Sequence, residues 1–181
     1  MAWSFQSAAM DGQEWWQNTL VCCSIISPFP FYWALWNYPQ AWVNMCGPNI
    51  DPCQRMAHVA HVLKFIQISA LFTVSVFSWP PFYCWILIIL GQYLNLRVYQ
   101  LLGEDGVYYG VRFGKNIPWV HEFPFGYMKD PQYIGSTLSL IGCLFWVPWP
   151  YVLLWSACYL LMSFMESKED ISSRAKLLKP S

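Results

Sequence analysis

The stretch FYCWILIILGQYLNLRVYQLL, residues 82–102, decides the fold class of this chain. It contains a single charged side chain, Arg97, and it matches the roughly 20 mostly apolar residues that an α-helix needs to cross a bilayer. Pro80 and Pro81 precede the stretch, and Gly-Glu-Asp-Gly follows it at 103–106. Because proline interrupts helices and glycine beside acidic residues favours a turn, the stretch is predicted to form one membrane-spanning helix.

Two further apolar segments precede this helix. Residues 57–79 predict a second crossing that ends at the proline pair, and the short connection predicts an antiparallel helical hairpin with the helix described above. Residues 20–43 predict a first crossing. Proline interrupts that segment at three positions, so its helix is expected to be kinked or broken: Pro28, Pro30 and Pro39.

A last apolar segment, residues 131–165, contains Val-Pro-Trp-Pro at 147–150. One crossing takes about 20 residues, so two full crossings fit only tightly in this segment. The segment is expected to form either one long kinked span or two shorter helices that meet in a turn, and we favour the two helices. The predicted fold class is an all-α integral membrane protein with four to five transmembrane helices, the last two as a proline-broken pair. It is one domain, 1–181, with a poorly ordered tail at 1–18 and a second tail at 167–181.

Small residues recur every four positions within this last segment, at Gly135, Ser139 and Cys143. Such a stripe lets another helix approach closely, because no large side chain separates the two backbones. The stripe is therefore interpreted as a packing surface. Space for a ligand beside a shorter partner helix is the secondary interpretation.

The composition indicates that lipid is the solvent of this chain. Hydrophobic residues make up 56% of the sequence and charged residues only 11%, whereas about a quarter of an ordinary globular domain is charged. The formal net charge is zero, which argues against a nucleic-acid-binding surface. Neither a disulfide framework nor a metal site is expected, because the cysteines are odd in number and Cys46 and Cys53 have no second pair with zinc-site spacing.

The positions of the basic residues predict how the helices are oriented. No lysine or arginine precedes Arg55, and all ten lie between Arg55 and Lys179. Cytosolic loops are enriched in lysine and arginine, so the helix ends that these residues flank are expected on the cytosolic side. The N-terminal tail is then lumenal, and the tail at 167–181 is cytosolic.

Several polar side chains lie where membrane packing alone does not require them. Arg97 either extends its long side chain to the membrane surface or belongs to a functional site, and the sequence leaves both open. His58, His61 and Lys64 follow one another at helical spacing. Contact with lipid headgroups explains them better than a metal site does, because no third ligand accompanies the two histidines.

The strongest functional signal lies in residues 103–137. GEDGVYYGVRFGK at 103–115 combines glycines, which let the backbone approach a ligand, with tyrosines that can face a cation and basic residues that can neutralise carboxylate or phosphate. EFPF at 122–125 and DPQYIGST at 130–137 continue the pattern. A site that processes lipid headgroups needs this mixture, but a loop at the membrane surface can share its composition, so the residues alone leave both open.

These segments resemble the phospholipid N-methyltransferase family, and in particular its plant-type members. The similarity extends from about residue 28 to residue 170, and its most specific parts are GVYYGVRFGK at 106–115, FPF at 123–125 and DPQYIGST at 130–137. More distantly, the chain resembles isoprenylcysteine carboxyl methyltransferases and membrane sterol reductases, which share a C-terminal helical cofactor site.

The resemblance implies an S-adenosylmethionine-dependent enzyme in the endoplasmic-reticulum membrane, with its site facing the cytosol. The implied reaction converts phosphatidyl-N-methylethanolamine through the dimethyl lipid to phosphatidylcholine, with the phospholipid entering from the bilayer. Animal relatives bind the cofactor with a Gly-x-Gly element and a Glu-Glu pair, and half of each is present here. The cofactor-binding residues expected on this basis are Gly91, Tyr93, Arg97, Tyr108, Tyr109, Gly110, Arg112, Pro131, Tyr133 and Glu166.

Catalytic and substrate-binding residues are expected in the same segments. The acceptor amine must lose a proton before it can attack, and a nearby carboxylate could take that proton. The catalytic candidates are Glu104, Asp105, Asp130 and Tyr133. The candidates for contact with the lipid headgroup and its phosphate are Lys115, Lys129, His58 and His61.

Other functions are kept as alternatives. One is a related membrane methyltransferase that acts on an isoprenylcysteine carboxylate, and another is a non-catalytic membrane scaffold. A scaffold explains the apolar helices but not the loop at 106–115, which is rich in glycine, tyrosine and arginine. Sterol reduction with NADPH is disfavoured, because the reductases have much longer chains.

Overall fold

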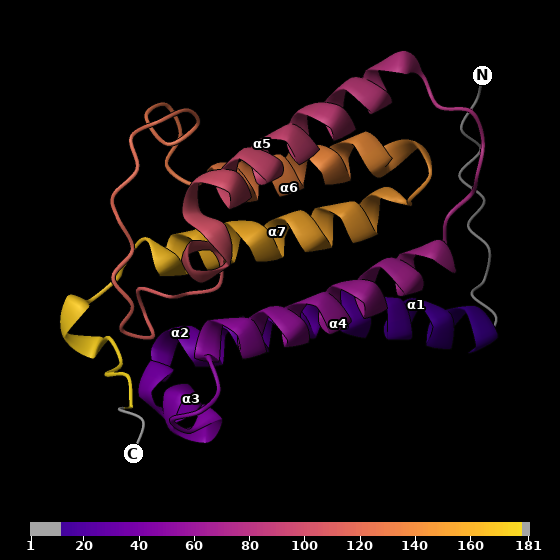
Figure 1. The fold of residues 1–181 in the computed structure, drawn as a ribbon. Coiled ribbons are helices and arrows are strands. Elements are labelled where there is room, and N and C mark those ends of the chain that lie inside the picture. Colours follow the sequence, from indigo (N-terminus) through magenta and orange to yellow (C-terminus); the bar gives the residue numbers. More distant parts are fainter. Residues whose placement is uncertain (1–11, 179–181) are drawn as a thin grey trace.

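All regular secondary structure in residues 12–178, the part of the chain that the computed structural model describes, is helical (Figure 1). This confirms the predicted all-α class. The α-helices are α1 (Gly12–Ile26), α2 (Pro28–Asn37), α3 (Pro39–Cys46), α4 (Pro52–Phe72), α5 (Phe82–Val107), α6 (Pro131–Gly142) and α7 (Trp149–Glu166). Two short 3₁₀-helices follow α6 and α7, namely η1 (Cys143–Phe145) and η2 (Ile171–Ser173).

Prolines divide the first apolar segment, as predicted. Helices α1 and α2 are nearly continuous, because Ser27 keeps helical backbone angles and its N–H donates to the carbonyl of Cys23. Tyr38 leaves the helical region, with φ −124° and ψ 53°, directly before Pro39. Helix α3 therefore starts in a new direction.

Helix α4 ends at Phe72, earlier than the predicted end at residue 79. The chain beyond it is not helical, because tertiary hydrogen bonds replace the helical ones. The Val76 N–H donates to the carbonyl of Trp146 at 2.9 Å, and the Trp146 indole donates to the carbonyl of Ser78 at 2.8 Å. These bonds attach the α4–α5 connection to the turn between α6 and α7.

Helix α5 bends where the sequence predicts a turn. Gly103 has φ 65° and ψ −174°, a conformation that glycine adopts without steric cost. One further helical turn follows and ends at Val107. The bend directs the loop after α5 toward α4 (Figure 1).

Helix α5 packs closely against α6 and makes much less contact with its hairpin partner α4. A Cβ atom added to Gly91 would lie 2.3 Å from the carbonyl oxygen of Gly135 and 2.3 Å from Ser139 Oγ, so the two helices touch at backbone distance. The side chain of Gln92 also donates to Ser139 Oγ at 2.9 Å. The small-residue stripe of α6 is therefore a packing surface.

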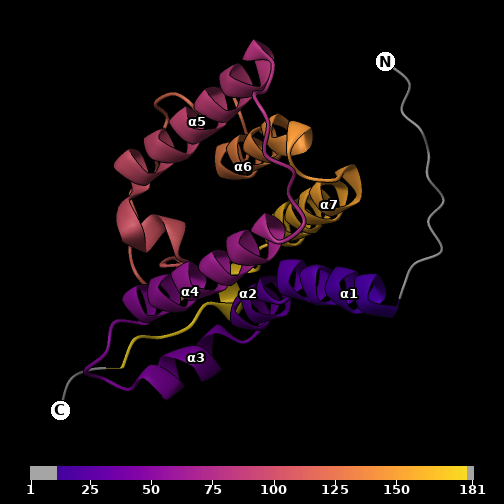
Figure 2. The ribbon, with the colours of Figure 1, turned by 90° about the vertical axis from the view of Figure 1, so that its right-hand side faces the viewer.

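Helices α1, α4 and α7 share the main apolar core. Ile25, Phe29 and Trp155 belong to one buried cluster there. The buried amide of Gln67 donates to the carbonyl of Ile25 at 2.7 Å, which satisfies a polar group inside this core. Helix α7 belongs to this core, and α6 lies between α7 and α5 (Figure 2).

The two ends of the helical bundle differ in charge. Helices α4 and α6 begin, and α5 and α7 end, at the same end of the molecule (Figure 1). Charged residues are absent from the sequence between 65 and 91 and between 137 and 163, the parts nearest the opposite end. Two helical segments, Trp15–Asn37 and Phe82–Val107, are long and apolar enough to cross a membrane.

Both predicted tails contain ordered structure. Residues 12–18 of the N-terminal tail are helical, and residues 1–11 lie outside the described residues. The C-terminal tail packs back onto the bundle: the Ala175 N–H donates to the carbonyl of Arg112, and the Lys176 N–H donates to Oε1 of Gln40, each at 2.8 Å.

Replacing Gly91 with alanine is expected to destabilise the protein by about 1–3 kcal/mol, because the added methyl group has no space between α5 and α6. Thermal unfolding of the purified protein in detergent should show a lower midpoint. Ala157→Leu adds more volume on an exposed face of α7 and should leave the midpoint unchanged. An unchanged midpoint for Gly91→Ala would contradict direct contact between the two helices.

Candidate active site

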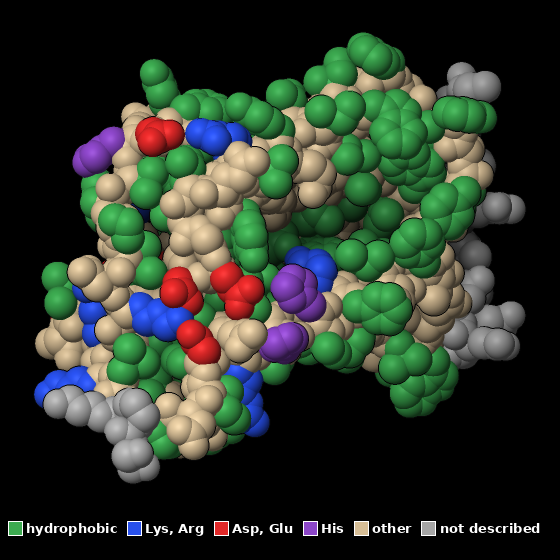
Figure 3. All heavy atoms as spheres, in the orientation of Figure 1, with side chains coloured by type: hydrophobic (Ala, Val, Ile, Leu, Met, Phe, Trp, Pro, Cys, Tyr) green, Lys and Arg blue, Asp and Glu red, His purple; other side chains and the backbone are tan. Residues whose placement is uncertain are grey.

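A cavity of about 660 Å³ lies at the charged end of the bundle. Side chains from α2, α4, α5, α6 and α7 and from the loop after α5 line it. Its volume falls within the range of about 300–1,000 Å³ that is usual for small-molecule pockets. Figure 3 shows the hollow between hydrophobic side chains, with basic and histidine side chains at its edge. A ligand that enters meets both apolar walls and polar groups.

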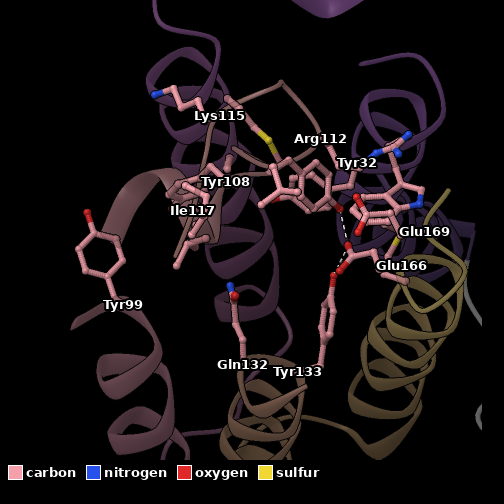
Figure 4. Close-up of a pocket in the computed structure, with 18 of the residues that line it drawn as sticks. Tyr32, Tyr99, Tyr108, Arg112, Lys115, Ile117, Gln132, Tyr133, Glu166 and Glu169 are labelled. Atoms are coloured by element: carbon pink, nitrogen blue, oxygen red, sulfur yellow. Dashed lines mark hydrogen bonds between the residues drawn. The ribbon is translucent and has the colours of Figure 1, made fainter. Parts of the chain in front are cut away.

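Glu166, at the end of α7, is the carboxylate at the centre of the site. Its Oε1 accepts a hydrogen bond from the hydroxyl of Tyr133 at 2.5 Å and another from the hydroxyl of Tyr109. Figure 4 shows Tyr133 extending from α6 toward Glu166. Three separate elements therefore meet at one carboxylate oxygen.

The loop after α5 folds so that Tyr109 points into the cavity. Tyr109 has a positive φ of 58°, which is rare for a residue with a Cβ atom. The next residue, Gly110, donates its N–H to the carbonyl of Asp105 at 2.8 Å, and a Cβ atom there would lie 2.5 Å from that oxygen. Burial, and then the nearby Tyr133 and Glu166, raise the pKa of Tyr109 well above its ordinary value. Its hydroxyl therefore keeps its proton and donates to the carboxylate.

Arg112 joins the site to the C-terminal tail. Its Nη1 donates to the carbonyl of Asp170 at 3.2 Å and to Ser173 Oγ at 2.9 Å, and its Nη2 donates to the carbonyl of Trp36. The guanidinium also lies 4.7 Å from the centre of the Trp36 ring. Its buried Nε has no partner in the described part of the chain, which leaves one donor for a ligand. Burial lowers the pKa of Arg112, although so basic a group stays charged.

Aromatic side chains form much of the cavity wall. Tyr108 lies beside His61, with its hydroxyl 3.3 Å from Nε2. Tyr32 and Tyr159 line the side near α2 and α7. Tyrosine faces attract cations, so this wall suits a positively charged ligand.

Lys115 forms an ionic clamp at the outer edge of the cavity. Its ammonium donates to Asp51, the N-cap of α4, at 2.5 Å, and also to Asp105 in the last turn of α5. Asp51, Cys53 and Asp105 lie close enough together to hold a metal ion. The Lys115 ammonium supplies the positive charge there instead, so this cluster gives no support for a metal.

Seven of the predicted site residues line the cavity: His61, Tyr108, Tyr109, Arg112, Lys115, Tyr133 and Glu166. Figure 4 shows that Lys115 lies at the rim and points away from Glu166. Of the cofactor and catalytic candidates that line the cavity, Tyr109 and Tyr133 contact Glu166, and the loop at 106–115 contributes several of the lining residues.

The other predicted residues do not line this cavity. Arg97 donates to Gln100 at 3.0 Å and lies 3.7 Å from Glu122, so its guanidinium faces the loop at 122–125. Tyr93 stacks on Phe123. Gly91 packs against α6, and Gly110 forms the turn after α5. The residues outside the cavity are His58, Gly91, Tyr93, Arg97, Glu104, Asp105, Gly110, Lys129, Asp130 and Pro131.

A smaller cavity, of about 300 Å³, lies between α6 and α7. Lys129 and Asp130 line it, and Asp130 accepts a hydrogen bond from Ser163. Tyr133 borders both cavities. The carboxylate of Asp130 is thus hydrogen-bonded beside the main site rather than inside it.

Sequence reasoning missed several residues that line the main cavity. Tyr32, Trp36 and Tyr159 lie in apolar segments where aromatic residues are common, so nothing in their spacing separates a cavity wall from a lipid-facing surface. Asn95 is a polar residue inside the apolar helix α5, which makes it a functional candidate from sequence, but the sequence did not assign it to the site. Its Oδ1 is buried and has no partner in the described residues.

Comparison with known proteins adds independent information. The phospholipid methyltransferase family model matches residues 81–170. A phosphatidyl-N-methylethanolamine N-methyltransferase of Arabidopsis thaliana is 60% identical over 158 residues, which cover 87% of this chain and 96% of that relative. No solved structure matches the chain.

The Lys115 clamp predicts a difference in acid stability between the wild type and Asp51→Asn. Burial alone would raise the pKa of Asp51, but hydrogen bonds from Lys115 and Cys53 lower it below its ordinary value. The stability that the carboxylate contributes is therefore full above about pH 4 and is lost as the pH falls through the lowered pKa. Asparagine still caps α4, so only the charge is removed.

Thermal midpoints in detergent, measured from pH 7 to pH 2.5, test this. The wild type should unfold at a higher temperature at pH 7, and the two midpoints should converge in acid. A gap that stays constant over the whole range would mean that the Asp51 charge does not stabilise the fold.

Proposed function

The chain belongs to the phospholipid methyltransferase family, and we propose that it methylates phosphatidyl-N-methylethanolamine and then the dimethyl lipid, which yields phosphatidylcholine. The observation that best supports this is the Glu166 carboxylate, which two tyrosine hydroxyls hold inside an aromatic cavity. A negative charge and tyrosine faces together favour cations. The sulfonium donor is a cation, and the acceptor amine is also a cation in the protonated form in which it binds.

S-adenosylmethionine, when bound, supplies a methyl group bonded to a positively charged sulfur. An amine that attacks the methyl carbon displaces the sulfur. The groups around Glu166 fit such a molecule. The unpartnered Nε of Arg112 suits a carboxylate, and the unpartnered Oδ1 of Asn95 suits an N–H or O–H donor. Oε1 of Glu166 accepts both tyrosine hydrogen bonds, and its Oε2 can accept from an amino group.

The main contribution of the protein is to position the two reactants. Holding the amine in line with the methyl group can lower the barrier by about 7–11 kcal/mol, because the cost of bringing the partners together is met on binding. Tyr108 and Tyr109 would contribute cation–π contacts of about 0.5–2 kcal/mol each.

Deprotonation of the amine must precede attack, since an ammonium has no lone pair. Of the predicted catalytic residues, Tyr133 lines the main cavity. We propose that the Tyr133 oxygen accepts this proton while its own hydroxyl proton passes to Glu166 along the 2.5 Å hydrogen bond. Asp105 and Asp130 are hydrogen-bonded outside the cavity and do not fit this role.

We propose that the site faces the cytosol from the endoplasmic-reticulum membrane. The charged end of the bundle contains the cavity, and basic residues mark the cytosolic side of membrane proteins. The combined α1–α2 segment, α4 and α5 would then each cross the membrane. Helix α6, with 12 residues, is too short to cross alone and would form a helical pair with α7. The exposed faces of these helices are rich in large apolar side chains, which suits contact with lipid.

Glu166→Gln is expected to lower kcat/KM for phosphatidyl-N-methylethanolamine by about 10- to 100-fold, because a charged hydrogen-bond acceptor is lost. Tyr133→Phe should lower kcat more than it raises KM for either substrate, since it removes the proposed proton acceptor. The assay uses purified protein, labelled S-adenosylmethionine and the acceptor lipids with no, one or two methyl groups.

Glu122→Gln is the matched control, because Glu122 is a carboxylate exposed outside the cavity. It should keep wild-type kinetics. Binding of S-adenosylhomocysteine, measured by calorimetry, reports cofactor affinity separately from turnover. Wild-type kinetics in Glu166→Gln would refute the assignment of the site, and failure of the wild type to methylate any of the three lipids would refute the function.

A further inference from the structure

Lys64, on α4, places a positive charge inside the aromatic cavity, on the side of α7 that carries Tyr159. We propose that this ammonium binds the phosphodiester of the acceptor lipid and so fixes where the reacting nitrogen lies. The proposal deepens the methyltransferase function and rests on it. The sequence predicts contact with lipid headgroups for His58, His61 and Lys64, and the structure places His61 and Lys64 in the lining of this cavity.

The contacts of Lys64 leave its charge without a counterion. Its Nζ donates to the hydroxyl of Tyr159 at 2.6 Å and lies 4.6 Å from the centre of the Trp155 ring and 5.2 Å from that of Tyr159. Among the described residues, the ion pairs involve Arg97, Lys115 and Arg174, and Lys64 takes part in none.

An ammonium in such a place needs an anion. Charged groups within membrane helices are costly unless they pair, and aromatic faces compensate only part of that cost. A phosphodiester that arrives with the ligand would supply the missing negative charge and accept the remaining N–H groups of Lys64. The acceptor phospholipid contains such a group beside its amine.

Neighbouring side chains suit a phosphate at the same place. His61 lies one helical turn before Lys64 and lines the same cavity, where its ring contacts Tyr108. The Tyr159 hydroxyl, which accepts from Lys64, can donate its own proton to a phosphate oxygen. The ammonium, the imidazole and the phenol thus line one wall of the cavity.

The spacing along α7 separates this wall from the carboxylate. Tyr159 and Glu166 are seven positions apart, which corresponds to about 10 Å of helix. Tyr133 lies between them: its ring centre is 5.7 Å from that of Tyr159, and its hydroxyl donates to Glu166. A lipid with its phosphate at Lys64 would extend its amine toward Tyr133, the proposed proton acceptor.

The lysines predicted for the phosphate fit this role less well. The Lys115 ammonium already donates to Asp51 and Asp105, so its charge is neutralised. Lys129 is exposed and borders the smaller cavity, outside the main one.

The decisive comparison uses purified full-length protein and two forms of the acceptor lipid. One is phosphatidyl-N-methylethanolamine, and the other has its phosphate methylated to a neutral triester of nearly the same shape. The wild type should show a KM about 10- to 100-fold higher for the neutral lipid. Lys64→Met should raise KM for the charged lipid by a similar factor, remove most of this preference and leave KM for S-adenosylmethionine unchanged. Lys64→Arg, which keeps the charge, should restore part of the preference.

Controls separate the possible failures. Lys176→Met removes an exposed lysine of the tail and should keep wild-type values, and S-adenosylhomocysteine binding shows whether each variant is folded. If Lys64→Met fails to fold, the two lipids compared on the wild type still test the need for a charged phosphate. Excess inorganic phosphate should not compete with the acceptor lipid. Strong competition would assign the site to free phosphate.

Three results would overturn the proposal. The first is equal use of both lipids by a wild type that is otherwise active, and the second is a Lys64→Met variant that loses affinity for S-adenosylmethionine rather than for lipid. The third is a rise in KM for the charged lipid that Lys129→Met shows and Lys64→Met does not. A wild type that binds no S-adenosylhomocysteine and methylates no lipid would instead refute the proposed function itself.

Discussion

The hydrogen bonds from Tyr109 and Tyr133 to one oxygen of Glu166 are the interaction on which the site depends. They join the loop after α5, the first turn of α6 and the end of α7 at one point. A carboxylate in such surroundings is stable only with donors around it, and the two hydroxyls provide them. The same arrangement places a carboxylate beside the cavity, which supports the proposed binding of cationic groups there.

The sequence predicts those parts of the fold that local rules determine. Apolar length indicates the spanning helices, prolines indicate the breaks at α2, α3 and α7, and the small residues of α6 indicate its contact with α5. The co-occurrence of glycine, tyrosine and arginine makes the loop at 106–115 a candidate for a site, although a loop at the membrane surface can have the same composition. For these features, neighbours in sequence decide the structure.

Other features depend on residues far apart in the chain. Helix α4 ends early because Val76 bonds to the backbone of Trp146, and Lys115 is neutralised because Asp51, at the start of α4, reaches it. Arg97 belongs to a spanning helix but faces the loop that contains Glu122. A spacing rule cannot distinguish the cavity side of a helix from its lipid side when both are aromatic, so the sequence does not identify Tyr159. The spacing of Lys64 suggests headgroup contact, but its place beside Tyr159 depends on the packing of α4 against α7.

The attachment of the segment after α7 has a consequence for access to the cavity. Arg112 donates to Asp170 and Ser173, and the backbone of Ala175 bonds to Arg112, so residues 169–175 complete one wall of the cavity. This wall lies beyond the end of the last α-helix. Displacing the segment would therefore widen the cavity without moving any of the long apolar helices.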